Sequence, residues 1–191
     1  MTQAQLRFSS FDDYLSYNDG TDKFYELYNG KLIEVPPESG ENVSIATFLL
    51  LQFVPLVGYL RVRSQGLELE VRGEPRNRYP DLTIIREEHI AQLQRRNTIR
   101  LSMLPPLLVI EVVSPGELQR DRDYIAKRRQ YEDLGIPEYW IVDPQVECAV
   151  VLTLQDQVYQ EVGIFQGDSQ IVSPTFPELN LTAETLLNAG H

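Results

Sequence analysis

Two carboxylates and one lysine carry the chemistry that this sequence suggests. Glu111 lies in residues 107–113, a seven-residue run that is otherwise aliphatic and follows Pro105-Pro106. Such a run is typical of a β-strand covered on both faces. A buried carboxylate loses hydration at a cost of several kcal/mol, so we expect a cation, a metal or a set of donors beside it. The alternative is a glutamate paired with a local arginine, or one facing solvent on a half-covered strand.

Asp81 begins the preceding predicted strand, residues 81–85, directly after Tyr79-Pro80. Pro80 restricts Tyr79 to extended backbone. If the two strands are neighbours, Asp81 and Glu111 can share a divalent cation, and a few oxygen ligands completed by water suit Mg²⁺ (or Mn²⁺). Such a cation would polarise a phosphoryl oxygen and lower the pKa of a bound water. Taken alone, Asp81 is better explained by an Asx turn after the proline.

Lys127 is the third candidate, on a helix predicted over residues 118–134. Spacings of three and four residues put a polar and aromatic set on one face of this helix: Arg120, Asp123, Tyr124, Lys127 and Tyr131. A lysine near a metal could orient or deprotonate water, or neutralise charge that develops on phosphate. Taken alone, Lys127 is better explained by a surface pair with Asp123, worth about 0.3–0.5 kcal/mol.

Glu26 is a possible fourth acid, among the aromatic residues of 24–28. Its plainer interpretation is a solvated position on a strand.

The elements that must position these residues alternate between helices and strands, which predicts one mixed α/β domain over residues 1–191. Ser9-Ser10 opens a short helix that ends near Asn18-Asp19-Gly20, and Asn29-Gly30 joins a hairpin of residues 24–28 and 31–35. A helix with an apolar stripe follows Ser39 and runs to about Val54. Further strands are predicted at 59–63, 67–72, 138–142, 147–154, 158–165 and 170–172, with a helical turn at 87–94 and a closing helix at 182–188. In residues 67–72 the strict alternation predicts one wet face that includes Glu68.

The composition indicates a globular protein of the cytoplasm. The chain has 191 residues, 42% of them hydrophobic, and its one cysteine, Cys148, excludes an internal disulfide and is expected to be a buried thiol. No secretory signal and no membrane segment are expected, because residues 1–5 lack the charged and apolar pattern and the apolar stretch at 49–57 is short and interrupted.

The charge is distributed unevenly. The net charge is −11, yet residues 61–100 hold nine arginines against six acids and residues 130–191 hold ten acids with no lysine or arginine. A positive middle is compatible with a phosphate-binding face. It is equally compatible with the acidic tail of one subunit covering the basic middle of another, so charge alone does not decide.

The sequence offers few of the residues that other enzyme classes require. The two histidines are His89, expected on an exposed helix, and the terminal His191, too few for a Ser/His triad or a histidine zinc site. No Gly-rich phosphate loop is present, so no organic cofactor is expected.

Several motifs follow one another in a fixed order: Tyr25-Glu26-Leu27 with Asn29-Gly30, Tyr79-Pro80-Asp81, Ile110-Glu111-Val112-Val113-Ser114-Pro115, Asp121-Arg122-Asp123 with Lys127 and Tyr131, and residues 135–143. Their order resembles that of a bacterial family of restriction-endonuclease-like proteins in the PD-(D/E)XK nuclease superfamily. The resemblance spans about residues 10–188. It implies a restriction-endonuclease-like α/β core with a mixed sheet flanked by helices, an N-terminal hairpin and extra C-terminal antiparallel strands.

The resemblance also implies roles. Asp81 and Glu111 would be the metal ligands, with a main-chain carbonyl beside Glu111 as a further ligand, Lys127 would be the catalytic lysine, and Glu26 would lie near the cleft. The sequence departs from the superfamily pattern at Val113, where the lysine two residues after the second acid is expected. Lys127 can substitute only if its helix packs over the face of Glu111. A second departure is Glu41-Asn42, at the start of the long helix where many relatives have a histidine, so this helix offers no imidazole to the site.

Two functions follow. The first is a Mg²⁺-dependent DNA endonuclease that leaves a 3′-hydroxyl and a 5′-phosphate. Its candidate DNA contacts are Arg61, Arg63, Arg76, Arg78, Arg120 and Arg128. The second is a nuclease fold with weak or no turnover that acts as a dimeric DNA- or protein-binding module; the acidic tail and Val113 favour it. The hairpin and the C-terminal strands make a homodimer the expected assembly.

Overall fold

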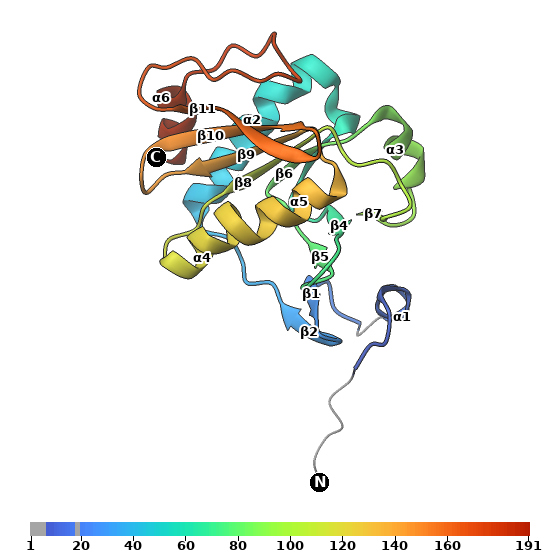
Figure 1. Ribbon diagram of the computed structural model, residues 1–191. Helices are drawn as coiled ribbons and strands as arrows, with labels where there is room; N and C mark the ends of the chain where they lie inside the picture. The colour runs from blue at the N-terminus through green and yellow to red at the C-terminus, as the bar shows by residue number, and fades with distance from the viewer. Residues whose placement is uncertain (1–6, 18–19) are drawn as a thin grey trace.

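A six-stranded sheet in the order β11-β10-β9-β8-β6-β3 forms the centre of the fold. The computed structural model describes residues 7–17 and 20–191 (Figure 1). β8 pairs with β9 in parallel and the other neighbouring pairs are antiparallel, so the sheet is mixed, as predicted. Its strands are β3 (Val62–Ser64), β6 (Leu82–Ile84), β8 (Leu108–Val112), β9 (Glu138–Asp143), β10 (Cys148–Gln155) and β11 (Val158–Phe165).

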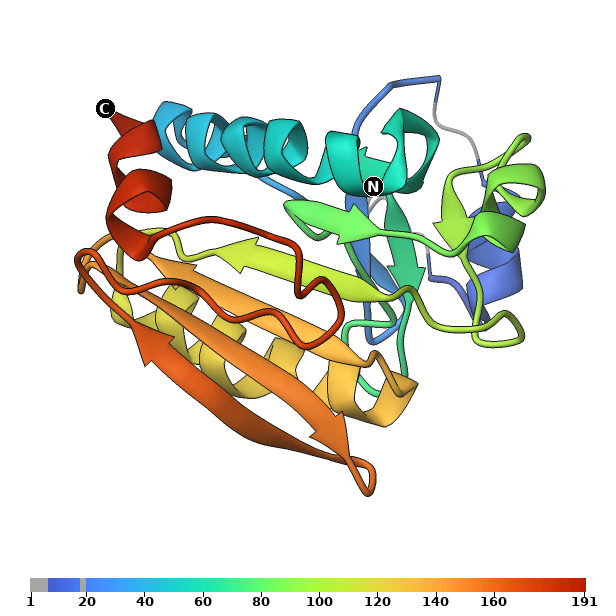
Figure 2. The ribbon, with the colours of Figure 1, turned by 90° about the horizontal axis from the view of Figure 1, so that it is seen from above.

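Helices cover both faces of this sheet. α2 (Gly40–Val57) lies on one face, and a continuous helix made of α4 (Glu117–Asp121), η2 (Arg122–Lys127) and α5 (Arg128–Leu134) lies on the other (Figure 2). Alternate residues of each central strand therefore enter two apolar layers, and all five residues of β8 are buried. The predicted flanked sheet is confirmed.

The first layer joins α2 to the sheet through Phe53 and Trp140, whose ring centroids lie 6.0 Å apart. The C-terminal residues Phe176 and Leu181 complete it, followed by α6 (Ala183–Leu187) and η3 (Asn188–Gly190). The second layer packs Tyr131 of α5 against Tyr139 of β9, with ring centroids 5.1 Å apart. Cys148 lies buried at its edge, as expected.

Local signals explain where the long helices begin and end. The Ser39 side chain accepts a hydrogen bond from the Asn42 backbone N–H and caps α2. Gly135 ends α5 in the left-handed conformation with φ of 76°, which favours glycine. By length and composition α2 is apolar enough to cross a membrane. Core helices meet the same criterion, and the buried side of α2 rests on the sheet.

The N-terminal part forms a smaller layer beside the main sheet (Figure 1). It contains α1 (Phe11–Leu15), the predicted hairpin of β1 (Tyr25–Tyr28) and β2 (Lys31–Glu34), and a three-stranded sheet in the order β5-β4-β7. These three strands are β4 (Glu68–Glu70), β5 (Asn77–Arg78) and β7 (Thr98–Ile99). Ser10 caps α1, as expected, and Asp13 completes a capping box with it. The predicted end of this helix at Asn18-Asp19 lies outside the described residues.

Four expectations need correction. Residues 59–63 begin as a 3₁₀ turn, η1 (Tyr59–Arg61), and residues 170–172 form only a bridge between Gln170 and Thr182. Glu68 is 3% exposed, because Asn77, Tyr79 and Thr98 surround its carboxylate on the face predicted to be wet. His89, in α3 (Glu87–Gln92), is fully buried because its ring bonds the Leu104 carbonyl at 3.0 Å and the Arg86 N–H at 3.3 Å.

Candidate active site

Asp81 and Glu111 lie opposite each other across two neighbouring strands. β6 and β8 pair antiparallel with Leu82 facing Ile110, so the same register places Asp81 beside Glu111 one step further. Residues directly opposite in an antiparallel pair project from the same face of the sheet. The backbone N–H of Val112 donates to Asp81 Oδ2 at 2.7 Å and fixes that carboxylate against β8. Both acids are buried, with 5% and 1% of their surface exposed.

Glu111 is held by a lysine and a tyrosine from the covering helix. Lys127 Nζ lies 2.7 Å from Glu111 Oε2, and the Tyr131 hydroxyl donates to Glu111 Oε1 at 2.5 Å. Lys127 also lies 2.7 Å from Asp123 Oδ1. The lysine therefore bridges two carboxylates, and its pair with Asp123 is buried rather than on the surface.

A π-helical segment places these groups. η2 spans Arg122–Lys127 between two α-helical parts, and a π-turn adds one residue to the turn. Asp123, Lys127 and Tyr131 face Glu111, whereas Arg120 and Tyr124 turn to Asp143 at 3.6 Å and 3.1 Å. The side chains predicted to form one polar face of the helix therefore contact two different acids, Glu111 and Asp143.

The electrostatics follow from burial and crowding of like charges. Burial raises the pKa of Asp81 well above its usual value, and the negative charges of Glu111 and Glu38 raise it further. Burial also raises the pKa of Glu111, although Lys127 opposes the shift. Burial alone would lower the pKa of Lys127, but Glu111 and Asp123 outweigh it and the pKa is raised. Lys127 is therefore a fixed positive charge at neutral pH.

Three groups near these acids were not predicted from the sequence. Glu38 precedes α2 and lines a cavity of about 290 Å³ together with Asp81. Asn42 contacts the Val112 carbonyl at 3.2 Å, Ser114 Oγ at 3.1 Å and Glu38 at 3.2 Å, so the helix position without histidine still reaches the strand of Glu111. The Arg122 Nε is buried, has no hydrogen-bond partner among the described residues, and lies 3.5 Å from Asp123. Only the run of charges at residues 120–123 could have signalled Arg122.

Glu26 lies at the margin of the cluster and not within it. Its carboxylate pairs with Arg78 at 3.0 Å, and Arg78 Nε donates to Gln130 of α5 at 2.8 Å. The negative charge of Glu26 reaches Arg122 only as a minor contribution to the raised pKa of that guanidinium. Glu26 thus connects the hairpin to the covering helix.

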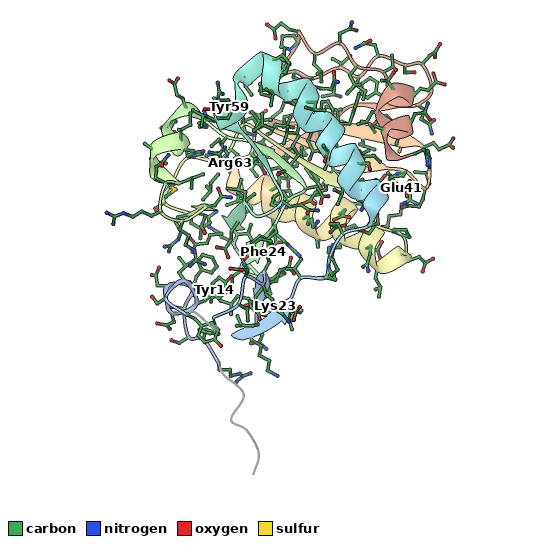
Figure 3. All side chains as sticks on the ribbon, turned by 180° about the vertical axis from the view of Figure 1, so that it is seen from behind. Tyr14, Lys23, Phe24, Glu41, Tyr59 and Arg63 are labelled. Atoms are coloured by element: carbon green, nitrogen blue, oxygen red, sulfur yellow. The ribbon has the colours of Figure 1, made fainter. Side chains whose placement is uncertain are left out.

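The predicted DNA contacts divide into two groups. Arg78 is 3% exposed and paired with Glu26 and Gln130, so it is a buried structural cation, which corrects its place among the candidates. The others are only partly buried or exposed: Arg61, Arg63, Arg76, Arg120 and Arg128. Arg63 lies opposite Thr83 on the edge strand β3, and Figure 3 shows it near the C-terminal end of α2.

The donor set fits a divalent cation that keeps water ligands. Asp81 and Glu111 supply two carboxylates, and the Val112 carbonyl lies on the same strand. Within residues 7–17 and 20–191, no three side chains of His, Cys, Asp or Glu gather closely enough to hold a metal by themselves. Mg²⁺ is commonly held by one or two carboxylates and several waters, so two carboxylates suffice.

Comparison with known proteins agrees with this architecture. The family model Uma2, described as "Putative restriction endonuclease", matches residues 11–184. A crystal structure described as "a putative nuclease belonging to DUF820" from Anabaena variabilis aligns with a TM-score of 0.69 and 20% sequence identity, covering 95% of this chain and 99% of that chain. A search of curated proteins gives no significant match.

Proposed function

This chain belongs to the Uma2 family of restriction-endonuclease-like proteins, and from that premise we propose that it is a Mg²⁺-dependent DNA endonuclease. In the proposed reaction the oxygen of a water attacks the phosphorus of a phosphodiester and the bond to the 3′-oxygen breaks. The products are a 3′-hydroxyl and a 5′-phosphate. The observation that carries the proposal is the opposition of Asp81 and Glu111 beneath Lys127.

Asp81 and Glu111 would hold the divalent cation. Burial raises the pKa of Asp81, and repulsion by the neighbouring carboxylate of Glu111 raises it further. A divalent cation offsets such repulsion, and in phosphoryl chemistry it polarises a phosphoryl oxygen and lowers the pKa of a water. Mn²⁺ would serve in the same place, because it also accepts carboxylate and water ligands.

Lys127 would stabilise the negative charge that develops on the phosphate. Its raised pKa keeps it protonated, so orienting the water or neutralising charge suits it better than removing a proton. Glu111 and Asp123 hold the amine in place on both sides. Lys127 would thereby take the role of the catalytic lysine, which a valine at position 113 cannot fill.

Plasmid nicking tests the proposal directly. Supercoiled DNA is incubated with the protein in Mg²⁺ or Mn²⁺, with and without chelator. We expect nicking that the chelator abolishes and that Lys127→Ala reduces, whereas Lys31→Ala, a lysine of the β2 strand, is the matched control. Equal nicking by Lys127→Ala and the parent would remove Lys127 from the mechanism.

The second candidate function is a binding module with weak or no turnover. One observation favours it: both Glu111 oxygens already contact Lys127 and Tyr131, an arrangement that is satisfied without a metal. Thermal unfolding with divalent ions separates the candidates. Stabilisation that is lost in Asp81→Ala and Glu111→Ala, without cleavage of any DNA offered, would leave only the binding module.

We also propose that the protein is a homodimer of the cytoplasm with DNA as its partner. The exposed N-terminal hairpin and the acidic C-terminal part of the chain, residues 130–191, which could meet a basic surface on a second subunit, support the dimer. Light scattering during size exclusion measures the mass: twice 22.0 kDa is the expected value, and 22.0 kDa alone would reject the dimer.

A further inference from the structure

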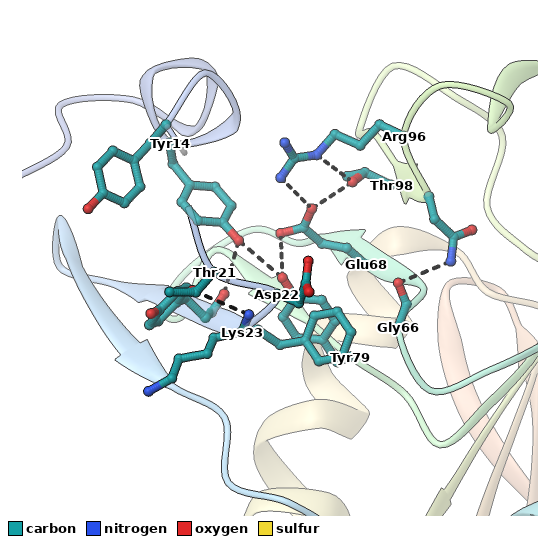
Figure 4. A pocket seen from close by; sticks show the side chains of 13 residues that line it. Tyr14, Thr21, Asp22, Lys23, Gly66, Glu68, Tyr79, Arg96 and Thr98 are labelled. Carbon is teal, nitrogen blue, oxygen red and sulfur yellow. Dashed lines mark hydrogen bonds and ion pairs between the residues drawn. The ribbon is translucent and has the colours of Figure 1, made fainter. Parts of the chain in front are cut away.

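A second cavity, of about 430 Å³, opens between the N-terminal hairpin and the small sheet (Figure 4). Ligand pockets are typically about 300–1,000 Å³, so the volume suffices for a small planar group. Aromatic side chains make up five of its thirteen lining residues, against 9% of the whole chain. They are Tyr14, Tyr17, Phe24, Tyr25 and Tyr79.

The floor of this cavity is a preorganised polar network. The buried carboxylate of Glu68 accepts hydrogen bonds from Asn77 at 2.7 Å, from the Tyr79 hydroxyl at 3.1 Å and from Thr98 at 2.6 Å. The hydroxyls of Tyr79 and Tyr14 lie 3.1 Å apart. Burial raises the pKa of both phenols, so they remain protonated donors. The rings are thereby fixed before any ligand arrives.

Two rings form an open wall. Phe24 and Tyr79 have ring centroids 4.9 Å apart, and 45% of Phe24 is exposed. Gly66 makes room for Phe24, because a Cβ at Gly66 would lie 3.3 Å from its Cζ. A half-exposed phenylalanine beside a fixed tyrosine is a stacking surface for a flat ring.

This wall leads directly to the candidate active site. The cavity beside Asp81 and Glu38 shares five lining residues with this one, including Phe24, Gly66 and Tyr79. Tyr79 and Asp81 are separated only by Pro80, so their Cα atoms lie within roughly 7 Å of each other. A group held against Tyr79 is therefore a near neighbour of a phosphate at Asp81.

Two basic side chains stand at the rim, each beside a carboxylate. Arg96 reaches Glu68 at 3.4 Å with 46% of its side chain exposed, and Lys23 pairs with Glu34 at 2.7 Å with 50% exposed. Aromatic walls beside exposed basic side chains are the pattern by which proteins bind single-stranded nucleic acid.

We propose that this cavity receives an unpaired nucleobase of the strand whose phosphate lies at Asp81, so that the substrate is DNA with an unpaired nucleotide beside the cleavage position. The inference rests on the proposed endonuclease function. The base would stack on Phe24 and Tyr79, and its backbone would approach Arg96. A paired duplex cannot offer its base to this wall without extruding it.

Binding of 2-aminopurine oligonucleotides in chelator tests the pocket without any cleavage. The three probes are a single strand, a fully paired duplex, and a duplex with 2-aminopurine opposite an abasic site. Stacking quenches the fluorescence of 2-aminopurine. We expect quenching and tight binding for the single strand, for the unpaired duplex position, or for both, and neither for the paired duplex. Binding of the single strand alone would indicate a single-stranded substrate, and binding of the unpaired duplex position alone would indicate an extruded base.

Substitutions at Phe24 test whether binding of the unpaired probes depends on the stacking surface of Phe24 and Tyr79. Phe24→Ala should weaken binding of the unpaired probes roughly 5- to 100-fold, since base stacking is worth about that much, and Phe24→Trp should restore it. Tyr59→Ala is the matched control, because Tyr59 is 73% exposed, lines neither cavity and lies beside the end of α2 (Figure 3).

The outcomes separate this inference from the endonuclease proposal. Two results would overturn the proposal that the cavity binds an unpaired base, even if the protein nicks DNA. One is equal binding of the paired duplex. The other is binding that Phe24→Ala does not change while circular dichroism shows a folded protein. Quenching that depends on Phe24 in a protein that never nicks DNA would support the pocket and reject the endonuclease.

Discussion

At the scale of single residues, Lys127 is the cation on which two buried carboxylates depend. Lys127→Ala leaves Glu111 and Asp123 without it, and breaking a buried pair by removing one partner costs about 3–5 kcal/mol. We expect a loss of that size in the free energy of unfolding, measured in urea. DNA nicking should fall about 10²- to 10⁴-fold, the range for a positioned polar group acting on a reacting centre.

A double variant separates stability from chemistry in this case. Lys127→Met with Glu111→Gln removes the positive charge and one negative charge together, so part of the lost stability should return. Nicking should be no higher than in Lys127→Ala, because both proposed roles are gone. Recovery of nicking in the double variant would contradict the assignment of both residues.

The raised pKa of Asp81 should make the stability of the folded protein depend on pH, and Mg²⁺ should reverse this dependence. Its pKa in the folded protein is raised above the usual 3.8, so the folded state binds the proton more tightly than the unfolded chain does. Stability from this group is therefore complete below pH 3.8 and is lost as the pH rises through the raised folded pKa. Thermal unfolding from pH 4 to 8 without metal should show this loss in the parent and not in Asp81→Asn.

Mg²⁺ provides the complementary measurement. Because the cation competes with the proton at Asp81, its stabilising effect should grow as the pH rises. The difference between parent and Asp81→Asn removes the contribution of the other carboxylates. Stabilisation by Mg²⁺ that is independent of pH, or that persists in Asp81→Asn, would exclude this site.

At the scale of elements, the π-helical turn η2 sets which side chains meet Glu111. Deleting Ile125, which is 48% exposed, should return the helix to an α register and shift the side chains of Asp123 and Lys127 relative to each other and to Glu111. We expect helical content by circular dichroism to stay and nicking to fall at least 10-fold, roughly the effect of misplacing a catalytic group. Ile125→Ala is the control, since it shortens the side chain and keeps the turn.

The strands of the main sheet were predictable because runs of apolar residues in the sequence indicate buried strands. The aliphatic run around Glu111 predicts a doubly covered strand, and all of β8 is buried. The opposition of Asp81 and Glu111 depends on the antiparallel register of β6 and β8, which residue types leave open. The π-turn was equally hidden, because residues 122–127 contain neither glycine nor proline.

Glu68 shows where sequence periodicity fails. Alternation along residues 67–72 separates two faces correctly, but it does not say what lies over the second face. Asn77, Thr98 and Tyr79 arrive there from other segments and satisfy the carboxylate. Glu38 was missed for a related reason, because its neighbours Asp81 and Asn42 come from distant parts of the chain.

At the scale of the whole molecule, the charge distribution limits how DNA can approach. The net charge is −11 and residues 130–191 hold ten acids and no lysine or arginine, so DNA must meet the arginines of the middle of the chain. Arg61 precedes the edge strand β3 and Arg63 lies on it, and within residues 7–17 and 20–191 only main-chain carbonyls accept from Arg61 Nε and the Arg63 guanidinium, at 3.0 Å and 3.4 Å. Their charges can therefore serve a phosphate.

Binding of DNA in chelator should weaken steeply with salt if these arginines contact phosphates. Each phosphate neutralised contributes a slope of about −0.9 for duplex DNA, or about −0.7 for a single strand, in a plot of log K against log salt. Arg61→Gln and Arg63→Gln should each make the slope shallower by about that amount and weaken all sequences alike. Arg72→Gln is the control, because Arg72 is 59% exposed but pairs with Asp133 at 3.0 Å. A slope that is unchanged in both variants would place the DNA on another face of the protein.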